Sequence, residues 1–303
     1  MKIFKKVLLV LLVLILFSAI LGYFYFDRKF SPEKNYLQVT NESGKVSIKW
    51  TDEEKKAMLL PIHFDSDTTT YYLQFDTGSP YTIFYKKSIS GNPHISINKN
   101  RAISSFKIGD SEVKSKQFKI IDFGEKANEK GFEIIGTIGT DILENRKTII
   151  NFKENYVIFN LSSEPQNFKN NAFDFSFKKR KIVIPAVLEN IDEKFLYDSG
   201  TSGYELLTNK EIWEKLKLKN SKIREEKGKS WNNILTTYTT ETNKNIEFHN
   251  TKIPLHEITY VEGYSKTQYY LMKFSGMSGM LGNKIFFEKQ LYIDTEKMKM
   301  RIE

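Results

Sequence analysis

The apolar and polar positions divide the chain into two very different parts. Residues 7–26 form an apolar run without a charged residue, and the remainder alternates between short apolar and polar stretches. At about 1.5 Å of rise per residue, a helix of this length covers the roughly 30 Å of a bilayer's hydrocarbon core. Three lysines precede the run, which predicts a cytoplasmic N-terminus with everything after the run on the other side of the membrane.

The run therefore predicts an N-terminal anchor, with residues 1–26 as cytoplasmic tip and transmembrane helix and residues 27–44 as a polar stalk. A signal peptide that is cleaved after export is the alternative. The run is long for a signal peptide, and no small-x-small cleavage pattern follows it. We therefore favour an uncleaved anchor in a single-pass membrane protein.

Beyond residue 46 the pattern is that of short β-strands. Apolar, β-branched and aromatic residues alternate with polar ones, and turn signals such as Gly109-Asp110 lie between the runs. The clearest predicted strands cover residues 59–64, 71–75, 148–152, 156–159, 181–187 and 194–197. One helix is predicted over residues 210–218, with Thr208 as its N-cap, because apolar residues recur there at helical spacing.

This second part of the chain contains the same unit twice. An Asp-Thr-Gly triplet at 76–78 corresponds to an Asp-Ser-Gly triplet at 198–200, and a Pro-containing apolar segment precedes each. A Gly-Thr-Ile-Gly element at 136–139 corresponds to Gly-Met-Leu-Gly at 279–282. After these elements the two copies align without a gap, and the second copy ends where the first does.

The repeat predicts an all-β protein made of two homologous lobes. The N-terminal lobe covers residues 45–160, the C-terminal lobe covers residues 173–303, and a polar linker of residues 161–172 joins them. Copies of this length are too long for solenoid repeats. Two such lobes would naturally enclose a cleft between them.

Composition narrows the classes of function. The formal net charge is +9, but the lysines are scattered among 37 acids and no nucleic-acid-binding motif accompanies them, so we expect no nucleic-acid partner. The chain has no cysteine, which excludes disulfides, thiolate metal sites and a cysteine nucleophile. A protein outside the cytoplasm without disulfides, and rich in Lys, Asn, Ile and Phe, is typical of bacteria.

The paired aspartates are the strongest chemical signal. A single Asp-Thr-Gly is most often a strand that ends in a tight turn. Here the two triplets occupy corresponding positions of a duplicated unit, so a pseudo-twofold axis would bring Asp76 and Asp198 together. Two carboxyl groups about 3 Å apart share one proton, and such a pair can activate a water and protonate a leaving amine without a metal or a covalent intermediate.

The segments around both triplets resemble the active-site signatures of aspartic proteases. Residues 75–79 (Phe-Asp-Thr-Gly-Ser) and 197–202 (Tyr-Asp-Ser-Gly-Thr-Ser) are similar to those of the pepsin-like family. Residues 136–141 (Gly-Thr-Ile-Gly-Thr-Asp) resemble the corresponding element of retropepsin-like proteases more closely. The resemblance covers most of residues 57–160 and 180–303, and it implies two β-barrel lobes of the pepsin-like acid protease fold.

The family implies a role for each residue of these motifs. The two aspartates form the catalytic dyad, Gly78 and Gly200 let amides approach the carboxylates, and Ser79 and Thr201 hydrogen-bond the outer carboxylate oxygens. Further glycines let a strand pass close behind each loop. The supporting residues are thus Thr77, Gly78, Ser79, Ser199, Gly200 and Thr201, and the structural residues behind the loops are Ile138, Gly139, Leu281 and Gly282.

The sequence departs from the family in the flap, the hairpin that covers the substrate. No Tyr-Gly-rich tip lies between Asp76 and Gly139, and residues 105–113 resemble the hairpin that follows the flap. Residues 90–102 are the remaining flap candidate, although they lack a tyrosine, and Pro80 stands where a small polar residue is usual. These departures concern substrate clamping and specificity and leave the dyad unchanged.

Other chemistries lack the residues that they need. The four histidines, His63, His94, His249 and His256, do not have the spacing of a zinc site. Ser278 lacks the surroundings of a nucleophile elbow. We therefore expect neither a metal nor a cofactor.

Two functions remain open. The first is an aspartic endopeptidase that acts outside the cytoplasm, as a membrane-anchored monomer, on a peptide or protein substrate. The second is a catalytically silent peptide-binding or scaffold protein that keeps the aspartic protease fold. Loss of either aspartate would have favoured the second function, and both are present.

Overall fold

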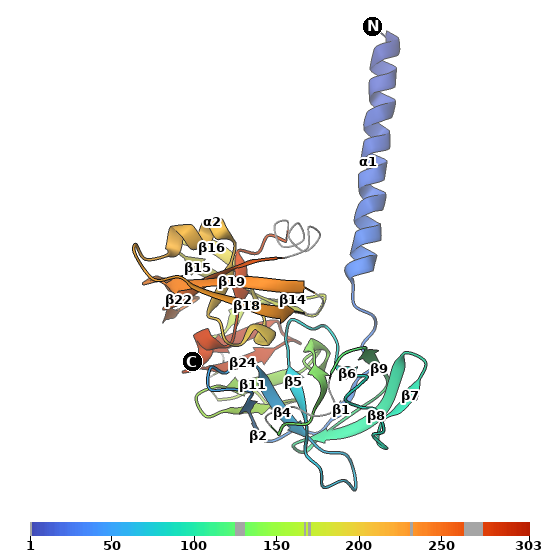
Figure 1. The fold of residues 1–303 in the computed structure, drawn as a ribbon. Helices are drawn as coiled ribbons and strands as arrows, with labels where there is room; N and C mark the ends of the chain where they lie inside the picture. The colour runs from blue at the N-terminus through green and yellow to red at the C-terminus, as the bar shows by residue number, and fades with distance from the viewer. Residues whose placement is uncertain (1, 125–130, 167, 169–170, 231–232, 264–274) are drawn as a thin grey trace. The chain divides into compact units, whose positions relative to one another are not determined.

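The computed structural model describes residues 2–124, 131–166, 168, 171–230, 233–263 and 275–303. Contacts divide the chain into two units, Met1–Lys34 and Asn35–Glu303. The first unit consists mainly of helix α1 (Lys2–Phe30), drawn in blue in Figure 1. This helix is long and apolar enough to cross a membrane, and an 18-residue stretch of it has a mean hydropathy of 3.0.

Nearly all of the regular secondary structure described in the second unit is β-strand. The strands of its first sheet are β1 (Gln38–Thr40), β3 (Lys49–Trp50), β4 (Met58–Ile62), β5 (Tyr71–Phe75), β6 (Ile83–Tyr85), β7 (Ser96–Asn98), β8 (Arg101–Ile108), β9 (Ser111–Ile121) and β10 (Ile134–Ile138). Their order is β3-β4-β5-β10-β6-β9-β8-β7, with β1 paired to β9. This sheet forms the N-terminal lobe.

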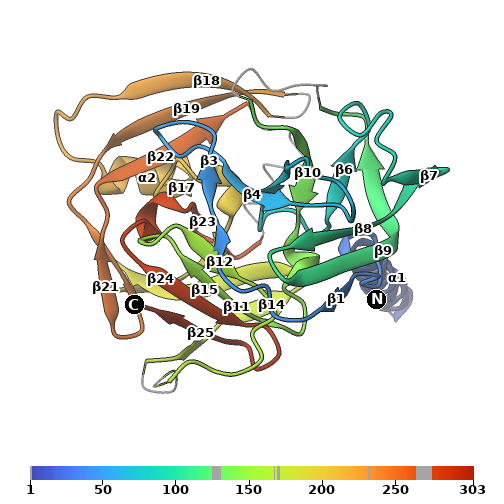
Figure 2. The same ribbon diagram turned by 90° about the horizontal axis from the view of Figure 1, so that it is seen from below.

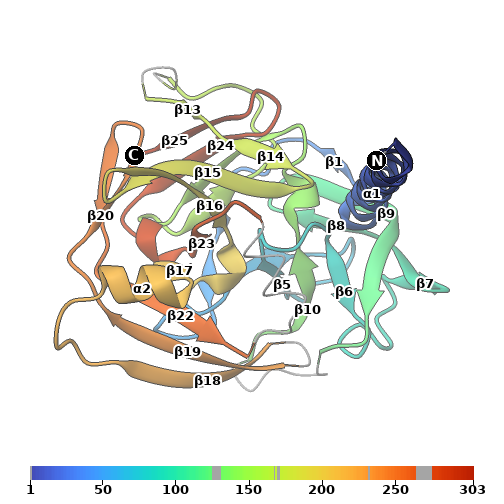
Figure 3. The same cartoon turned by 90° about the horizontal axis from the view of Figure 1, so that it is seen from above.

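A second large sheet forms the C-terminal lobe. Its strands are β14 (Ser176–Lys178), β15 (Lys181–Leu188), β16 (Ile191–Tyr197), β17 (Leu206–Thr208), β18 (Arg224–Ser230), β19 (Asn233–Glu241), β20 (Asn245–Phe248), β21 (Thr251–Pro254), β22 (Glu257–Glu262) and β23 (Gly279–Leu281). Their order is β18-β19-β22-β17-β23-β16-β15-β20-β21, with β14 paired to β15. Helix α2 (Lys210–Leu216) packs along β22 (Figure 3).

The two large sheets repeat each other strand by strand. In the N-terminal lobe β10 runs parallel to β5 and antiparallel to β6, and in the C-terminal lobe β23 runs parallel to β16 and antiparallel to β17. Likewise β6 is parallel to β9, and β17 is parallel to β22. Figure 2 shows the resulting halves on either side of the molecule. The predicted all-β fold of two homologous lobes is therefore confirmed.

A third sheet joins the lobes. Its strands are β2 (Val46–Ser47), β11 (Lys147–Asn151), β12 (Tyr156–Ile158), β13 (Phe173–Asp174), β24 (Gln290–Asp294) and β25 (Lys299–Ile302). At its centre β11 of the N-terminal lobe pairs with β24 of the C-terminal lobe. Ile150 and Ile293 from these two strands are fully buried. The strands that the gapless sequence repeat aligns thus pair with each other, which fixes the two lobes in one core.

The predicted helix is shorter than expected and differently capped. Asn209 is the N-cap of α2, because its side chain accepts a hydrogen bond from the Ile212 amide at 2.9 Å. Thr208 belongs to β17, and its hydroxyl donates to the Ser278 carbonyl at 2.6 Å. The prediction of Thr208 as the cap was therefore wrong. Thr208 and Asn209 both have a side chain that can cap a helix. Because β17 extends to Thr208, the cap position falls on Asn209.

Part of the segment predicted as a stalk packs into the second unit. Within residues 35–44, β1 pairs with β9, and the side chain of Asn35 donates to the carbonyl of Asp141 at 2.8 Å. A polar composition indicates exposed side chains, but it contains no information about backbone pairing at the edge of a sheet. The second unit thus begins at Asn35, within the polar stretch of residues 27–44.

Candidate active site

The two aspartates follow equivalent strands. Asp76 comes directly after β5, and Asp198 comes directly after β16. The amide of Asp76 donates to the Ile138 carbonyl at 3.0 Å, and the amide of Asp198 donates to the Leu281 carbonyl at 2.9 Å. Because β10 and β23 run parallel to these strands, each aspartate is fixed where its strand leaves the sheet.

The structure brings the carboxyl groups of Asp76 and Asp198 together: the β-carbon position of Gly200 lies 2.6 Å from Oδ1 of Asp76 and 3.0 Å from Oδ1 of Asp198. A hydrogen bond between the two side chains contributes to the pKa of both. Oδ1 of Asp76 accepts the Gly78 amide at 2.8 Å and the Ser79 amide at 3.2 Å. Oδ1 of Asp198 accepts the Gly200 amide at 2.9 Å. Each carboxyl group is therefore held by backbone donors of its own loop while it faces the carboxyl group of the other lobe.

The glycines of both triplets are required by the close approach of the opposite carboxyl group. A β-carbon on Gly78 would lie 2.7 Å from both carboxyl oxygens of Asp198. A β-carbon on Gly200 would lie 2.6 Å from Oδ1 of Asp76. These distances are well inside van der Waals contact. A side chain at either position would therefore push the two carboxyl groups apart.

Burial and mutual proximity perturb both carboxyl groups. Burial raises the pKa of Asp198 to about 7, and the charge of Asp76 is the second cause. Burial also raises the pKa of Asp76, but the amide of Gly78, the hydrogen bond with Asp198 and the amide of Ser79 act in the opposite direction. Because two adjacent carboxylates repel each other, the pair shares a proton, and Asp76 is the member that ionises first.

A reciprocal exchange of hydrogen bonds locks together the two loops that carry Asp76 and Asp198. The Thr77 amide donates to Oγ of Ser199 at 2.9 Å, and the Ser199 amide donates to Oγ1 of Thr77 at 2.8 Å. Both hydroxyls donate to a carbonyl of the opposite loop, on Tyr197 and Phe75 respectively. The sequence indicated only a general supporting role for these residues. A hydroxyl residue at the same place in both triplets was the signal that could have revealed the exchange.

The hydroxyls of Ser79 and Thr201 do not bind the carboxylates, contrary to the prediction. Oγ of Ser79 donates to the Tyr81 carbonyl, and Oγ1 of Thr201 donates to the Asp198 carbonyl, both at 2.8 Å. Each hydroxyl reaches a carbonyl of its own turn, while backbone amides occupy the carboxyl oxygens. Ser79 contributes to the dyad through its amide instead.

The second pair of glycines lies where one backbone crosses another. A β-carbon on Gly139 would lie 2.3 Å from the Tyr81 carbonyl oxygen, and one on Gly282 would lie 2.2 Å from that of Thr201. Ile138 and Leu281, the residues before these glycines, are fully buried under the two loops. The structure thus places all four residues directly behind the catalytic loops.

Two polar residues hold the catalytic loops from behind, and sequence reasoning missed both. Thr140 donates to the Ser79 carbonyl through its amide at 2.8 Å, and its hydroxyl lies 3.0 Å from the same oxygen. The Asn283 side chain donates to Oγ of Ser202 at 3.0 Å and accepts from the Tyr197 hydroxyl at 2.8 Å. Both residues are fully buried. A polar residue directly after the apolar–Gly element in both copies was the available signal.

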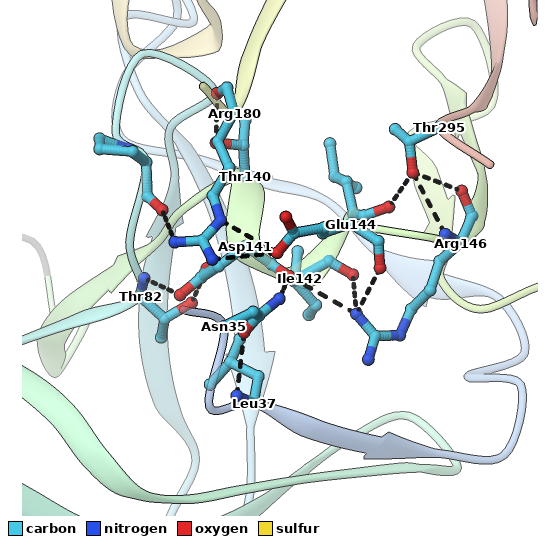
Figure 4. A network of polar contacts seen from close by, with 12 residues as sticks. Asn35, Leu37, Thr82, Thr140, Asp141, Ile142, Glu144, Arg146, Arg180 and Thr295 are labelled. Carbon is cyan, nitrogen blue, oxygen red and sulfur yellow. Dashed lines mark hydrogen bonds and ion pairs between the residues drawn. The ribbon is translucent and has the colours of Figure 1, made fainter. Parts of the chain in front are cut away.

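A buried polar network adjoins the N-terminal catalytic loop (Figure 4). The carboxyl group of Asp141 accepts hydrogen bonds from the amide and the hydroxyl of Thr82, both at 2.7 Å. Burial raises the pKa of Asp141 to about 6, while the bonds from Thr82 and the charge of Arg180 oppose this shift. Arg146 donates to three carbonyls of the same turn. The network fixes the segment around Thr82, which follows the Asp76 loop in the chain.

The predicted flap region forms β7 and the turns before it. β7 pairs with β8 and is the terminal strand of its sheet. Residues 105–113 form the hairpin between β8 and β9, which turns at Gly109 with a φ of 57°. That residues 90–102 cover a substrate stays a prediction.

The histidines serve other parts of the fold. His94 stacks on Phe64 and pairs with Asp67, and His256 pairs with Glu205. Within the described ranges, no three His, Asp or Glu side chains gather in a way that would hold a metal ion. The candidate site is therefore built from two carboxyl groups surrounded by backbone amides and hydroxyls.

Comparisons with known proteins address the fold. No family model matches the chain. A search of curated proteins also found no match. Among solved structures, the chain is similar to the crystal structure of an aspartic proteinase from Irpex lacteus, with a TM-score of 0.52, 12% sequence identity and coverage of 86% of this chain and 97% of that chain. The fold is that of the pepsin-like aspartic proteinases.

The pepsin-like fold accounts for the arrangement of the candidate site. The likeness extends over both lobes, because the match covers nearly the whole of the solved proteinase. In this fold the two loops that follow β5 and β16 meet between the lobes. The likeness concerns the fold, and the case for an activity rests on the geometry of Asp76 and Asp198.

Proposed function

We propose that this chain is an aspartic endopeptidase, in which Asp76 and Asp198 activate a water molecule to hydrolyse a peptide bond. One observation carries the proposal: two part-buried carboxyl groups from equivalent loops meet, so that the β-carbon position of Gly200 lies 2.6 Å from Oδ1 of Asp76 and 3.0 Å from Oδ1 of Asp198. Such a pair holds one proton between two acids, which supplies a base and an acid in one place. The pepsin-like fold supports this reading.

The unequal surroundings of the two carboxyl groups assign their roles. Asp76 accepts two loop amides and ionises first, so it acts as the general base that takes a proton from the water. Asp198 carries the shared proton and hydrogen-bonds the oxygen of the scissile carbonyl. The water oxygen adds to the carbonyl carbon, and the carbon–nitrogen bond then breaks as the amine receives a proton from the dyad.

A silent peptide-binding protein with the same fold is the second candidate. The observation that favours it is the short β7, since the region expected to form the flap contributes only three residues to a terminal strand. A protein without an effective flap would bind peptides between its lobes, but it would lack the cover that separates the site from bulk water. The complete dyad favours the peptidase.

The location of the chain is a further part of the proposal. We place the second unit outside the cytoplasm, on a single-pass anchor formed by α1, where it acts as a monomer on a peptide or protein substrate. The apolar length of α1 and the lysines before it support this orientation. Deletion of residues 1–30 should release the protein from the membrane fraction, and retention of the shortened chain on the membrane would contradict an anchor.

Cleavage of a peptide library separates the two candidate functions. The full-length protein in lipid nanodiscs is incubated with a diverse library between about pH 3.5 and 6, where one proton resides on the dyad. Mass spectrometry then maps the products with and without a statine-type inhibitor, which mimics the tetrahedral intermediate. The peptidase predicts internal cleavage that the inhibitor blocks. Binding of library peptides without cleavage would instead support the silent protein.

A further inference from the structure

Arg180 occupies a turn position that usually belongs to Gly, Asn or Asp. It is the second residue of the two-residue turn between β14 and β15, in which Lys179 and Arg180 have φ angles of 56° and 57°. Such turns disfavour bulky residues, because a positive φ brings the β-carbon close to the backbone. A long side chain at this strained position points to a role for the side chain itself.

The Arg180 side chain leaves the C-terminal lobe and is buried against the N-terminal lobe (Figure 4). Only 4% of the residue is exposed. Its Nε and Nη2 donate to Oε2 of Glu144 at 3.1 and 3.0 Å, and its Nη1 donates to the Pro80 carbonyl at 3.3 Å. The guanidinium also lies 5.4 Å from the centre of the Tyr81 ring. In return, the Thr140 hydroxyl donates to the Arg180 carbonyl at 2.7 Å.

These contacts reach the segment that holds the ionised member of the dyad. Pro80 directly follows Ser79, whose amide donates to Asp76. Proline has no amide, so its carbonyl is the only backbone group through which hydrogen bonds can hold it. Arg180 binds that carbonyl, and the amide of Thr140 binds the carbonyl of the preceding residue. The two contacts together fix the backbone on which the Ser79 amide is carried.

The pseudo-equivalent contact in the opposite direction is much looser. The loop between β3 and β4 brings Lys56 to Gly203 of the C-terminal lobe, where a β-carbon on the glycine would lie 3.4 Å from Cγ of the lysine. The Lys56 side chain is 54% exposed and forms an ion pair with its neighbour Glu54. The C-terminal lobe therefore binds the segment after Asp76 firmly through Arg180. The N-terminal lobe contacts the corresponding segment after Asp198 only loosely, through Lys56.

We propose that Arg180 is a positioning residue that couples the arrangement of the two lobes to the shape of the Asp76 loop. It acts through Pro80 and the Ser79 amide, and it does not touch the reacting atoms. This inference rests on the proposed peptidase function, because the geometry that it protects is that of the dyad. A shift of the C-terminal lobe would move the guanidinium and with it the backbone beside Asp76.

Hydrogen–deuterium exchange of the full-length protein in nanodiscs tests the coupling directly. Exchange of residues 79–84 is compared with that of residues 201–206, the counterpart segment of the other lobe. Arg180→Met keeps the length of the side chain but removes its donors, and Arg180→Lys keeps the charge but not the fork of donors. Lys56→Met is the matched control. The same proteins are assayed for kcat and KM on a peptide that the wild type cleaves.

Arg180→Met should accelerate exchange in residues 79–84 about tenfold and leave residues 201–206 unchanged. Its kcat should fall about 10- to 100-fold with KM nearly unchanged, because a misplaced dyad affects the transition state more than binding. Arg180→Lys should recover part of both losses, and Lys56→Met should resemble the wild type. Unchanged exchange in residues 79–84, or equal acceleration of both segments, would overturn the proposal.

Two further outcomes separate this inference from the proposed function. If Arg180→Met does not fold, Glu144→Gln provides the same test, because it weakens the grip but keeps the arginine, and unchanged local exchange there also overturns the inference. If the wild type cleaves no peptide while exchange responds locally, the peptidase fails and the coupling stands. If the wild type cleaves and Arg180→Met keeps its kcat, the positioning role fails and the peptidase stands.

Discussion

The two loops that carry Asp76 and Asp198 match at the aspartates and differ immediately beyond them. At the dyad, each aspartate accepts the amide of its own glycine, and the middle residues of the two triplets exchange equivalent hydrogen bonds. Beyond it, the N-terminal loop reaches Thr82, which donates two hydrogen bonds to the buried carboxyl group of Asp141. The C-terminal loop reaches Glu205, whose own carboxylate accepts the amides of residues 256 and 257.

The difference shows which part of the duplicated unit the proposed chemistry constrains. At the dyad, both lobes hold the carboxyl group through the amide of its own glycine and exchange hydrogen bonds through the middle residue of the triplet, and only the Ser79 amide on Asp76 has no counterpart. The segments beyond the dyad only have to be held in place. A buried carboxyl group and an arginine from the other lobe hold one segment, whereas a carboxylate with backbone amides holds the other. Within its own loop, Asp76 accepts two amides and Asp198 accepts one.

The symmetric part of the comparison predicts the largest effects. Gly78→Ala and Gly200→Ala should each lower kcat/KM at least about a hundredfold, because either β-carbon would displace the opposite carboxyl group. Gly228→Ala is the matched control, since no atom lies within 4 Å of its β-carbon position. Peptide cleavage rates of the three variants provide the measurement. A large loss at one glycine and none at the other would break the equivalence of the two loops.

The asymmetric part predicts a pH effect that belongs to one lobe. The pKa of Asp141 is raised from its ordinary value of 3.8 to about 6, so the native state binds more protons than the unfolded state between these values. This group therefore stabilises the fold at low pH, and its contribution falls by at most about 3 kcal/mol as the pH rises through 6.

Asp141→Asn should remove this part of the pH dependence. Urea unfolding between about pH 3.5 and 7 measures the free energy of unfolding of both proteins. Asp198 contributes with the same sign in both proteins, so it cancels in the difference. We expect the curve of the variant to fall less steeply with rising pH. Parallel curves for the variant and the wild type would show that Asp141 ionises as an ordinary carboxyl group.

The exchange between the triplets predicts the smallest effects, and they should be shared between the lobes. Thr77→Val and Ser199→Ala should each lower the free energy of unfolding by about 2 kcal/mol, because each leaves a buried amide without its acceptor. The double variant should cost less than the sum by at least about 0.5 kcal/mol. Thr68→Val, at an exposed threonine, is the control. Additive losses would indicate that the two hydrogen bonds act independently and do not couple the loops.

The sequence predicted the architecture and the position of the aspartates because both follow from local patterns. Alternation located β5 at residues 71–75, the bounds that the structure has. The gapless repeat after Gly139 and Gly282 made Asp76 and Asp198 equivalent points, and the equivalent pairing of β10 and β23 reproduces this equivalence. A duplicated unit allows residues far apart in the sequence to be related, because the position of a residue in one copy predicts the position of its counterpart in the other copy.

The support beyond the dyad could not be predicted, because it depends on contacts that no local pattern encodes. Arg180 and Glu144 are 36 residues apart and belong to different lobes. A two-residue turn at Lys179-Arg180 also contradicts the usual preference for small residues, so the sequence did not mark it as a turn. The hydroxyls of Ser79 and Thr201 were predicted wrongly, because residue type fixes what a hydroxyl can bind but not which acceptor lies nearest.

Replacement of each aspartate tests the central claim most directly. The full-length wild type, Asp76→Asn, Asp198→Asn and the control Asp192→Asn, which alters an exposed residue near the start of β16, are compared for cleavage of the same peptides below the pKa of Asp198. The account predicts that each of the first two variants loses at least about a hundredfold in kcat, since each removes one half of the proton-sharing pair, and that the control keeps its activity. Undiminished cleavage by either dyad variant would show that the peptide bond is hydrolysed elsewhere.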